Sequence, residues 1–325
     1  MKRISILVPK GAILGSLEGT RQMFSQVNQF CTAKGEPPLF HVELLGLAKD
    51  TTLTGGLFTA HVDTTISEVA KTDLIIIPAI DGDLQEGINA NSEFIPWIKE
   101  QYHNGAEVAS LCLGAFLLAA TGILNGRKCA THWMAEQAFK SMFPNVTLVT
   151  EKIITDEQGI YSSGGAFSYL NLILYLIEKY SDRATAVLIA KVFAIEIERS
   201  SQLSFVIFQG QKEHNDDIVK QVQAYIEQHY QDKISVDELA SLFAVGRRNL
   251  ERRFKKATCN TIMEYIQRVK IEAAKINLER SRENVNEAMY KVGYSDSKAF
   301  RTTFKKITGL SPLQYRNKYN QALTA

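Results

Sequence analysis

A set of residues in the last third of the chain recurs fifty positions further along. The matched positions carry the same side chain or a similar one: Leu250 and Phe300, Phe254 and Phe304, Lys255 and Lys305, Lys256 and Lys306, Thr258 and Thr308, Tyr265 and Tyr315. In each copy the two apolar anchors are four residues apart, which is the spacing of one face of an α-helix. The last third is therefore predicted to contain two copies of one helical unit.

Each copy is predicted to be a short helix, a tight turn and a second helix. Ser235 and Glu238 have the spacing of a capping box, in which both side chains bond free backbone N–H groups at a helix start. Residues 261–280 are rich in good helix formers and predict a long helix that joins the copies. Ser311-Pro312 predicts the start of a last short helix, because serine favours the cap and proline the first helical position.

Both copies carry the side chains that a DNA-reading helix needs. A helix-turn-helix lays its second helix in the major groove, so that helix requires an apolar stripe inward and donors outward. The outward donors are Arg247, Arg248, Asn249, Arg252 and Lys255 in the first copy and Ser297, Lys298, Arg301, Thr302 and Lys305 in the second. The joining helix would hold these helices about one DNA turn apart, roughly 34 Å. We predict double-stranded DNA as the partner; the alternative is a helical interaction domain with a solvated basic face.

The charge of the chain is divided unevenly along its length. Residues 1–214 carry 17 Lys and Arg against 22 Asp and Glu, a net charge of −5, whereas residues 215–325 carry 20 against 13, a net charge of +7. A compact basic domain attached to a mildly acidic one suggests a polyanion partner for the former and a different role for the latter. Two solvated surfaces of opposite sign are the alternative.

The first two-thirds of the chain alternates short apolar runs with amphipathic stretches, which predicts a parallel sheet covered by helices on both faces. The predicted strands are 4–9, 40–47, 74–78, 107–111 and 147–150. The predicted helices are 19–31, 94–102, 115–120, 136–142, 167–180 and 184–195. Residues 209–217 are polar and predict a linker. The result is an α/β domain at 1–208 and an all-α domain at 218–325.

Nothing in the sequence indicates a secreted, membrane or metal-binding protein. Cys31, Cys112, Cys129 and Cys259 lack the spacing of a zinc site or a disulfide framework. The longest apolar runs are too short to span a membrane. The apolar run at the N-terminus is broken by Pro9, so it predicts a first buried strand and not a signal peptide. We expect a cytoplasmic protein without metal or cofactor.

Residues from about 218 to 319 resemble the AraC/XylS-type DNA-binding domain from end to end. The matching segments are 235–240, 249–256, 292–296, 299–301 and 304–316. The sequence departs from the family pattern at Met289, where a small residue is usual, and at Glu287-Ala288, where an apolar pair is usual. The resemblance implies a DNA-binding transcription regulator, for which RNA polymerase is a further candidate partner.

Cys112 lies where a buried strand-like run, 107–111, meets a helix-like run, 115–120. A turn there lifts the thiol above the carboxyl ends of the strands, where open α/β sheets bind ligands. A helix N-terminus at this place would lower the thiol pKa, and His132 is a candidate base or partner. The alternatives are a small buried hydrophobe at Cys112 and a packed or surface histidine at His132.

Residues from about 4 to 199 resemble the DJ-1/PfpI superfamily, in its glutamine-amidotransferase-like branch. The segments that carry this resemblance are 111–119, 122–127 and 130–133. The whole chain is similar to GlxA-type regulators, which fuse such a domain to an AraC-type domain. The resemblance implies a flavodoxin-like sandwich with a parallel sheet, and places Cys112 and His132 at the nucleophile-elbow and histidine positions. It also implies a homodimer formed through this domain.

Two departures from the DJ-1/PfpI pattern argue against catalysis. Ser16 falls where family enzymes have an acid, with Glu18 two positions away, and Ala79 replaces a glycine whose backbone lines the oxyanion site. An acyl-transfer enzyme needs a nucleophile, a base and an oxyanion hole together. We therefore predict no catalytic residues and a small-molecule effector bound near Cys112, Leu113, His132, Ala79 and Ile80. The resemblance implies that amines, amino acids and quaternary ammonium compounds are candidate effectors.

Two other activities stay open at this point. One is a cysteine-dependent amidase or hydrolase that the DNA-binding domain tethers to DNA, in which Cys112→Ala would abolish turnover. The other is a thiol-based redox or electrophile sensor, which requires a lowered pKa at Cys112.

Overall fold

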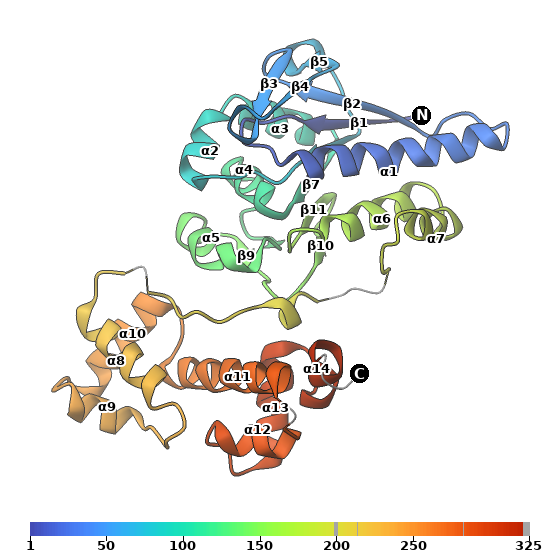
Figure 1. Ribbon diagram of the computed structural model, residues 1–325. Helices are drawn as coiled ribbons and strands as arrows, with labels where there is room; N and C mark the ends of the chain where they lie inside the picture. Colours follow the sequence, from blue (N-terminus) through green and yellow to red (C-terminus); the bar gives the residue numbers. More distant parts are fainter. Residues whose placement is uncertain (198–200, 213, 282, 321–325) are drawn as a thin grey trace. The chain divides into compact units, whose positions relative to one another are not determined.

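The computed structural model describes residues 1–197, 201–212, 214–281 and 283–320, and it divides into two compact units, Met1–Gln202 and Leu203–Ala325 (Figure 1). The boundaries expected from the sequence, with a linker at 209–217, remain a proposal. Among the helices in these ranges, none combines the length and the apolar character needed to cross a membrane.

A seven-stranded sheet forms the centre of the first unit, in the order β10-β11-β7-β6-β1-β2-β5. Its strands are β1 Lys2–Leu7, β2 Phe40–Gly46, β5 Thr64–Thr65, β6 Leu74–Ile77, β7 Glu107–Leu111, β10 Ile154–Asp156 and β11 Ile160–Ser163. Neighbours pair in parallel except β10 with β11. All four residues of β6 are buried, because a parallel sheet is covered on both faces. The expected parallel α/β architecture is confirmed.

Helices cover both faces of this sheet and create two apolar cores. Helices α1 (Leu14–Ala33), α6 (Tyr169–Tyr180) and α7 (Arg183–Val192) pack on the face that carries Ile4 and Ile6. Helices α3 (Phe94–His103), α4 (Ala115–Ala120) and α5 (Glu136–Met142) pack on the face that carries Leu7. The opposite placement of these β1 side chains follows from the two-residue period of a strand. The remaining elements are α2 Leu84–Ala90, η1 Thr54–Gly56, η2 Ile66–Glu68, η3 Cys112–Gly114, η4 Trp133–Ala135 and the pairs β3 Asp50–Leu53 with β4 Phe58–His61 and β8 Lys128–Cys129 with β9 Thr147–Leu148.

One predicted strand is wrong as a member of the main sheet. Residues 147–150 contribute only β9, which pairs with β8 outside the seven-stranded sheet, and β11 takes the place beside β7. β11 could not be predicted from the sequence, because Ser162 and Ser163 are polar and yet buried. Their hydroxyls have backbone donors: the Ala130 N–H lies 2.6 Å from Ser162 Oγ, and the Cys112 N–H lies 3.4 Å from Ser163 Oγ. A buried polar strand is tolerated when its groups are bonded in this way.

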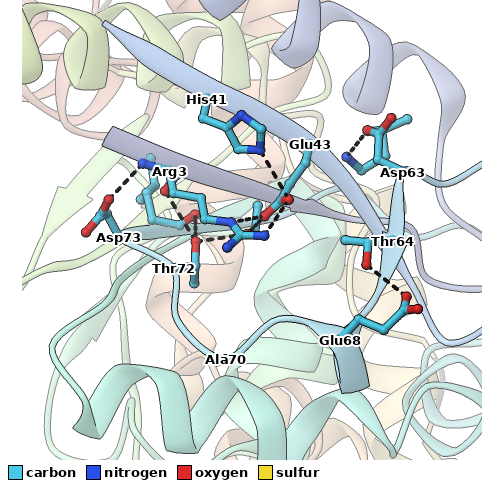
Figure 2. A network of polar contacts seen from close by, with 12 residues as sticks. Arg3, His41, Glu43, Asp63, Thr64, Glu68, Ala70, Thr72 and Asp73 are labelled. Carbon is cyan, nitrogen blue, oxygen red and sulfur yellow. Dashed lines mark hydrogen bonds and ion pairs between the residues drawn. The ribbon is translucent and has the colours of Figure 1, made fainter. Parts of the chain in front are cut away.

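A polar network around the buried Glu43 carboxylate ties three segments of the first unit together (Figure 2). Arg3 on β1 donates two hydrogen bonds to Glu43 on β2, at 2.7 and 2.8 Å, and the Ser5 hydroxyl donates a third at 2.9 Å. The backbone N–H of Arg3 donates to Asp73, just before β6, at 2.7 Å. Burial raises the pKa of Glu43, but the Arg3 and Ser5 donors outweigh it and hold this pKa below its ordinary value.

The second unit is helical and has two apolar cores that share one long helix, α11 (Ile262–Arg280). We define the first lobe as α8 (Asp217–Gln228), α9 (Val236–Leu242) and α10 (Arg247–Thr258) with the start of α11. The second lobe comprises the end of α11 with α12 (Val285–Lys291), α13 (Ser297–Thr308) and α14 (Pro312–Tyr319). A short 3₁₀ turn, η5 (Leu203–Phe205), precedes them. The all-helical second domain expected from the sequence is confirmed.

Capping boxes mark four helix starts in this unit. The capping box at Ser235 begins α9 as the sequence predicts. Ser311 caps α14 as predicted, and Gln314 completes a capping box there. Thr261 with Glu264 begins α11 in the same way, and Asn284 with Glu287 begins α12. Glu287, which departs from the family pattern, thus bonds the backbone at a helix start.

Candidate nucleic-acid interface and ligand site

Helices α10 and α13 have the same inward anchors. Leu250 and Phe254 of α10, and Phe300 and Phe304 of α13, are fully buried. In each helix a buried threonine closes the last turn: Thr258 donates to the Phe254 carbonyl at 2.8 Å, and Thr308 donates to the Phe304 carbonyl at 2.9 Å. The repeat in the sequence therefore corresponds to two equivalently anchored second helices, one in each lobe.

The side chains expected to read DNA lie on the opposite faces of these helices. Nine of the ten are exposed: Arg247, Arg248, Asn249, Arg252 and Lys255 on α10, and Lys298, Arg301, Thr302 and Lys305 on α13. Ser297 is partly buried at the start of α13. Two outward faces rich in donors, each fixed by a buried apolar stripe, give the geometry that major-groove reading requires.

Two of the outward residues of α10 already have acidic partners: Lys255, whose Nζ lies 3.7 Å from Glu264, and Arg247. The Arg247 guanidinium lies 2.9 Å from Asp237 on α9 and 3.5 Å from Glu251 on α10. The Asp237 carboxylate raises the pKa of Arg247. These contacts compete with any contact of Arg247 to DNA. Arg253 is also engaged inside the lobe, because it forms a two-bond ion pair with Asp216 at 2.8 and 2.6 Å.

Cys112 lies on a sharp turn directly after β7. Its backbone φ is +52°, a left-handed conformation that non-glycine residues seldom adopt, and its side chain is 4% exposed. The Cys112 N–H donates to the Ser163 hydroxyl, and the Cys112 carbonyl accepts a hydrogen bond from the Thr131 hydroxyl at 2.9 Å. Gly114 follows at a place where an added Cβ would lie 2.3 Å from the Pro78 carbonyl oxygen. The turn predicted at Cys112 is present and closely packed.

The Cys112 thiol is not activated. Burial raises its pKa to about 11, which outweighs the lowering effect of the Leu113 N–H. The lowered pKa expected from a helix start at this place is wrong, because the thiol is buried and α4 is only six residues long. The thiol is therefore protonated near neutral pH.

His132 does not act as a partner of this thiol. The ring is half-buried, and burial lowers its pKa. Its Nδ1 accepts the Met134 N–H at 3.2 Å and caps η4. Within the described ranges no hydrogen bond joins His132 to Cys112. The sequence predicted His132 as a partner of Cys112, but the hydrogen bonds of the described residues do not make the two a catalytic pair.

The positions that would supply an acid and an oxyanion donor are occupied in another way. Ser16 is buried, and its hydroxyl accepts the Ala79 N–H at 3.2 Å and donates to the Ile13 carbonyl at 2.8 Å. Glu18 lies away from this contact and is paired with Arg21 at 2.7 Å. Because the Ser16 hydroxyl accepts the Ala79 N–H, this N–H is not free to stabilise an oxyanion. Ile80 is buried and Leu113 partly buried.

Three residues near Cys112 were not singled out from the sequence. They are Thr131, Ser163 and Gln202, and all are buried. Gln202 Nε2 donates to the carbonyls of Thr131 and Lys152 at 3.1 and 3.3 Å. Gln202 Oε1 is buried with no hydrogen-bond partner in the described part of the chain. The only sequence signal was the polar Ser162-Ser163-Gly164-Gly165 turn, which does not reveal contacts with residues far along the chain.

Comparisons with known proteins agree with this division of the chain. The DJ-1/PfpI family pattern matches residues 40–179, and a helix-turn-helix domain pattern matches residues 239–318. The HTH-type transcriptional regulator GbdR of Pseudomonas aeruginosa is 26% identical over 225 residues, which are 69% of this chain and 61% of GbdR. CdhR, an HTH-type transcriptional regulator of the same species, is 23% identical over 315 residues, 96% of this chain and 90% of CdhR. The HTH-type transcriptional activator RhaS of an Enterobacter species is 31% identical over 104 residues, 32% of this chain and 37% of RhaS.

Solved structures resemble part of the chain in fold. A protein from Vibrio parahaemolyticus superposes with a TM-score of 0.53 at 22% identity, covering 59% of this chain and 98% of its own. An AraC family transcriptional regulator from Pseudomonas putida gives a TM-score of 0.50 at 13% identity, covering 59% of this chain and 100% of its own. Identities this low indicate a shared fold alone.

No group of three His, Cys, Asp or Glu side chains able to hold a metal ion occurs among the described residues.

Proposed function

Because the chain joins a DJ-1/PfpI-family domain to an AraC-type helix-turn-helix domain, we propose that it is a sequence-specific, DNA-binding transcription regulator that responds to a small molecule bound near Cys112. The observation that carries this proposal is the pair of equivalent helices, α10 and α13, with buried anchors and exposed donors. The net charge of +7 over residues 215–325 supports a polyanionic partner. Binding as a homodimer and contact with RNA polymerase belong to the same proposal.

The first test measures binding of the full chain to promoter-region DNA fragments at two salt concentrations by fluorescence anisotropy. Arg252→Ala on α10 and Arg301→Ala on α13 each remove one exposed donor. A lost base contact should cost about 1–3 kcal/mol of binding free energy and relax the sequence preference, whereas a lost phosphate contact should lower the salt slope by about 1. Arg183→Ala, at an exposed position of α7 in the first unit, removes the same charge elsewhere and is the matched control.

Specific binding that both variants weaken and Arg183→Ala leaves intact would support two reading helices. Equal binding by wild type and both variants would contradict them. If wild type shows no preference among fragments, the assay is repeated with candidate amines present, because a regulator can require its effector for specific binding.

The ligand is proposed to be an amine or an amino-acid derivative that carries N–H donors. The reason is the unpaired Gln202 Oε1, since a buried acceptor without a donor costs about 1–3 kcal/mol that a bound N–H would recover. Thr131 links this amide to the Cys112 turn, because it contacts both Gln202 and Cys112 through hydrogen bonds. A quaternary ammonium compound has no N–H to offer this acceptor.

Thermal unfolding in the presence of matched compounds tests the ligand class. Primary amines and amino acids should raise the melting temperature. At a ligand concentration of a hundred times Kd, binding adds about 2.7 kcal/mol to the free energy of unfolding. The shift should be absent in Gln202→Met, which keeps the approximate size of the side chain but removes the Oε1 acceptor together with the Nε2 donor. Equal shifts with the quaternary analogues would contradict this choice of ligand.

The geometry does not favour a cysteine hydrolase. Cys112 is protonated near neutral pH, His132 does not contact it, and the Ala79 N–H is already bonded to Ser16. Binding without turnover is therefore the proposed role of this site. Hydrolysis of small amides by wild type and its loss in Cys112→Ala would overturn that role.

A further inference from the structure

Residues 203–212, defined here as the strap, connect Gln202 to the helical unit and pack along it. The start of the strap is fixed to the second lobe. Lys275 of α11, a buried lysine, donates to the Val206 carbonyl at 2.6 Å. Tyr319 of α14 donates to the Ser204 carbonyl at 3.3 Å. The Lys275 ammonium is also paired with Glu272 at 2.8 Å, and removing a hydrogen-bond partner from a buried charged group is costly, so the Val206 carbonyl anchors this end of the strap.

The end of the strap is fixed to the first lobe. The ring of Phe208 packs edge-to-face on Tyr265 of the first lobe at 5.1 Å. The Phe208 N–H donates at 3.1 Å to Glu272, which lies further along α11 and pairs with Lys275. The Gln223 amide donates to the Gln211 carbonyl at 2.8 Å. Gly210 adopts a φ of +72°, and an added Cβ there would lie 2.3 Å from the Tyr265 hydroxyl. The strap thus spans both lobes, and α10 and α13 lie one in each.

The residue directly before the strap is tied to the Cys112 turn. Gln202 donates to the Thr131 carbonyl, and the Thr131 hydroxyl donates to the Cys112 carbonyl. The Gln202 N–H also bonds the Glu151 carbonyl at 3.1 Å. Gly164 leaves the space that the Gln202 amide fills, since an added Cβ would lie 2.3 Å from Nε2. Two hydrogen bonds thus connect the Cys112 turn to Gln202, the residue that directly precedes the strap.

We propose that the strap, acting together with the shared helix α11, sets the spacing of α10 and α13, and that Gln202 transmits the state of the Cys112 site to the strap. A molecule whose N–H bonds Gln202 Oε1 would draw the amide away from the Thr131 carbonyl, which Nε2 contacts, and so move the start of the strap. Since the strap holds both lobes, its displacement alters the placement of one reading helix relative to the other. The link to regulation rests on the proposed function, whereas the effect of Gln202 and the strap on the placement of α10 and α13 does not.

The first measurement is the distance between α10 and α13 in the full chain. Spin labels at Lys256→Cys and Lys306→Cys, both exposed and equivalent in the repeat, report this distance in a Cys259→Ser background, since the other cysteines are buried. Phe208→Ala should broaden the distance distribution and speed amide exchange in the strap about tenfold, through the lost aromatic packing. Ile207→Ala, at the adjacent exposed position, is the matched control and should change neither.

Gly210→Ala is the second strap variant, because its Cβ must displace the strap from Tyr265. A distance distribution that stays as narrow as wild type in both Phe208→Ala and Gly210→Ala would overturn the proposal that the strap sets the spacing.

The second measurement is hydrogen exchange of the strap when only the first unit is changed. Gln202→Ala and Thr131→Val each remove one of the two linking hydrogen bonds and should speed exchange of the strap amides several-fold. Gln209→Ala, which truncates an exposed glutamine within the strap, is the control. Unchanged exchange in both Gln202→Ala and Thr131→Val would overturn the role of Gln202. Neither measurement uses DNA or a ligand, so failure of the proposed function would leave both results standing.

Discussion

At the scale of single residues, helices α10 and α13 differ at the residue that caps the C-terminal end of each. Cys259 ends α10 with a φ of +57°, and Gly309 ends α13 with a φ of +74°. Both residues cap their helix by donating to the carbonyl four residues earlier, Lys255 and Lys305. A left-handed conformation costs a side chain about 1–2 kcal/mol, which glycine avoids. The first copy therefore carries strain that the second does not.

Replacing Cys259 with glycine is expected to stabilise the end of α10 by about 0.5–1 kcal/mol, because part of the relief is offset by the greater freedom of glycine in the unfolded chain. Native-state hydrogen exchange of α10 amides measures this, since both tryptophans, Trp97 and Trp133, lie in the first unit and do not report on the second. Gly309→Ala is the converse variant and should destabilise α13. Equal or faster exchange in Cys259→Gly would contradict the strain argument.

The thiols of this protein should differ in reactivity. Cys259 is exposed, whereas Cys112 is buried with its pKa raised to about 11 by burial. Near pH 7.5, iodoacetamide should modify Cys259 in the folded protein and leave Cys112 intact, and modification of Cys112 should increase only toward strongly alkaline pH. Mass spectrometry of the digested protein reads out each site. Equal modification of both cysteines at neutral pH would restore the thiol-sensor hypothesis.

The Glu43 network should make the first unit sensitive to acid. The pKa of Glu43 is lowered in the folded state, so its stabilisation is present above the ordinary carboxylate pKa and is lost as the pH falls through the lowered value. Glu43→Gln should cost about 1–3 kcal/mol near neutral pH, because it weakens charge-assisted hydrogen bonds, and should reduce the acid dependence. Tryptophan fluorescence during urea unfolding at several pH values measures both effects. Glu36→Gln, at an exposed position, is the control, and an unchanged acid dependence in Glu43→Gln would count against the network.

At the scale of elements, α9 restrains the first reading helix. Asp237 at the start of α9 holds Arg247 at 2.9 Å and places a negative charge beside the DNA-reading face. Asp237→Asn should release Arg247 and strengthen DNA binding, by roughly twofold to tenfold at low salt and less at high salt. Asp217→Asn, which removes the same charge at the exposed start of α8, is the control for net charge. Equal gains from both variants would show that only net charge matters.

The elements that were predicted well are those whose stability is local. The repeat, the capping boxes and α4 and α5 follow from periodicity and short-range hydrogen bonds, which a sequence displays directly. β11 was not predicted, because a strand with buried serines is stable only when remote backbone groups bond its hydroxyls. β9 was predicted as part of the main sheet because an apolar run does not reveal which strand will pair with it.

At the scale of the whole molecule, two units of opposite net charge are joined in one chain. The basic unit has a surface for DNA, and the acidic unit has a site that binds and does not catalyse, according to the proposed function. Regulation requires that the two be coupled, and a coupling free energy of about 1–3 kcal/mol is typical of such systems. The strap and Gln202 provide a covalent and hydrogen-bonded route for it.

The sequence by itself determined the division into an α/β and an all-α part, the duplicated helices α10 and α13 and the place of the Cys112 turn. The reason is that spacing, capping and charge are properties of neighbouring residues. Only the tertiary structure decided that Cys112 is protonated, that Ser16 occupies the Ala79 N–H and that Arg247 is held by Asp237. It also revealed the strap. These features arise from burial and from contacts between residues far apart in the chain, since desolvation and hydrogen-bond partners are set by packing and leave no local pattern in the sequence.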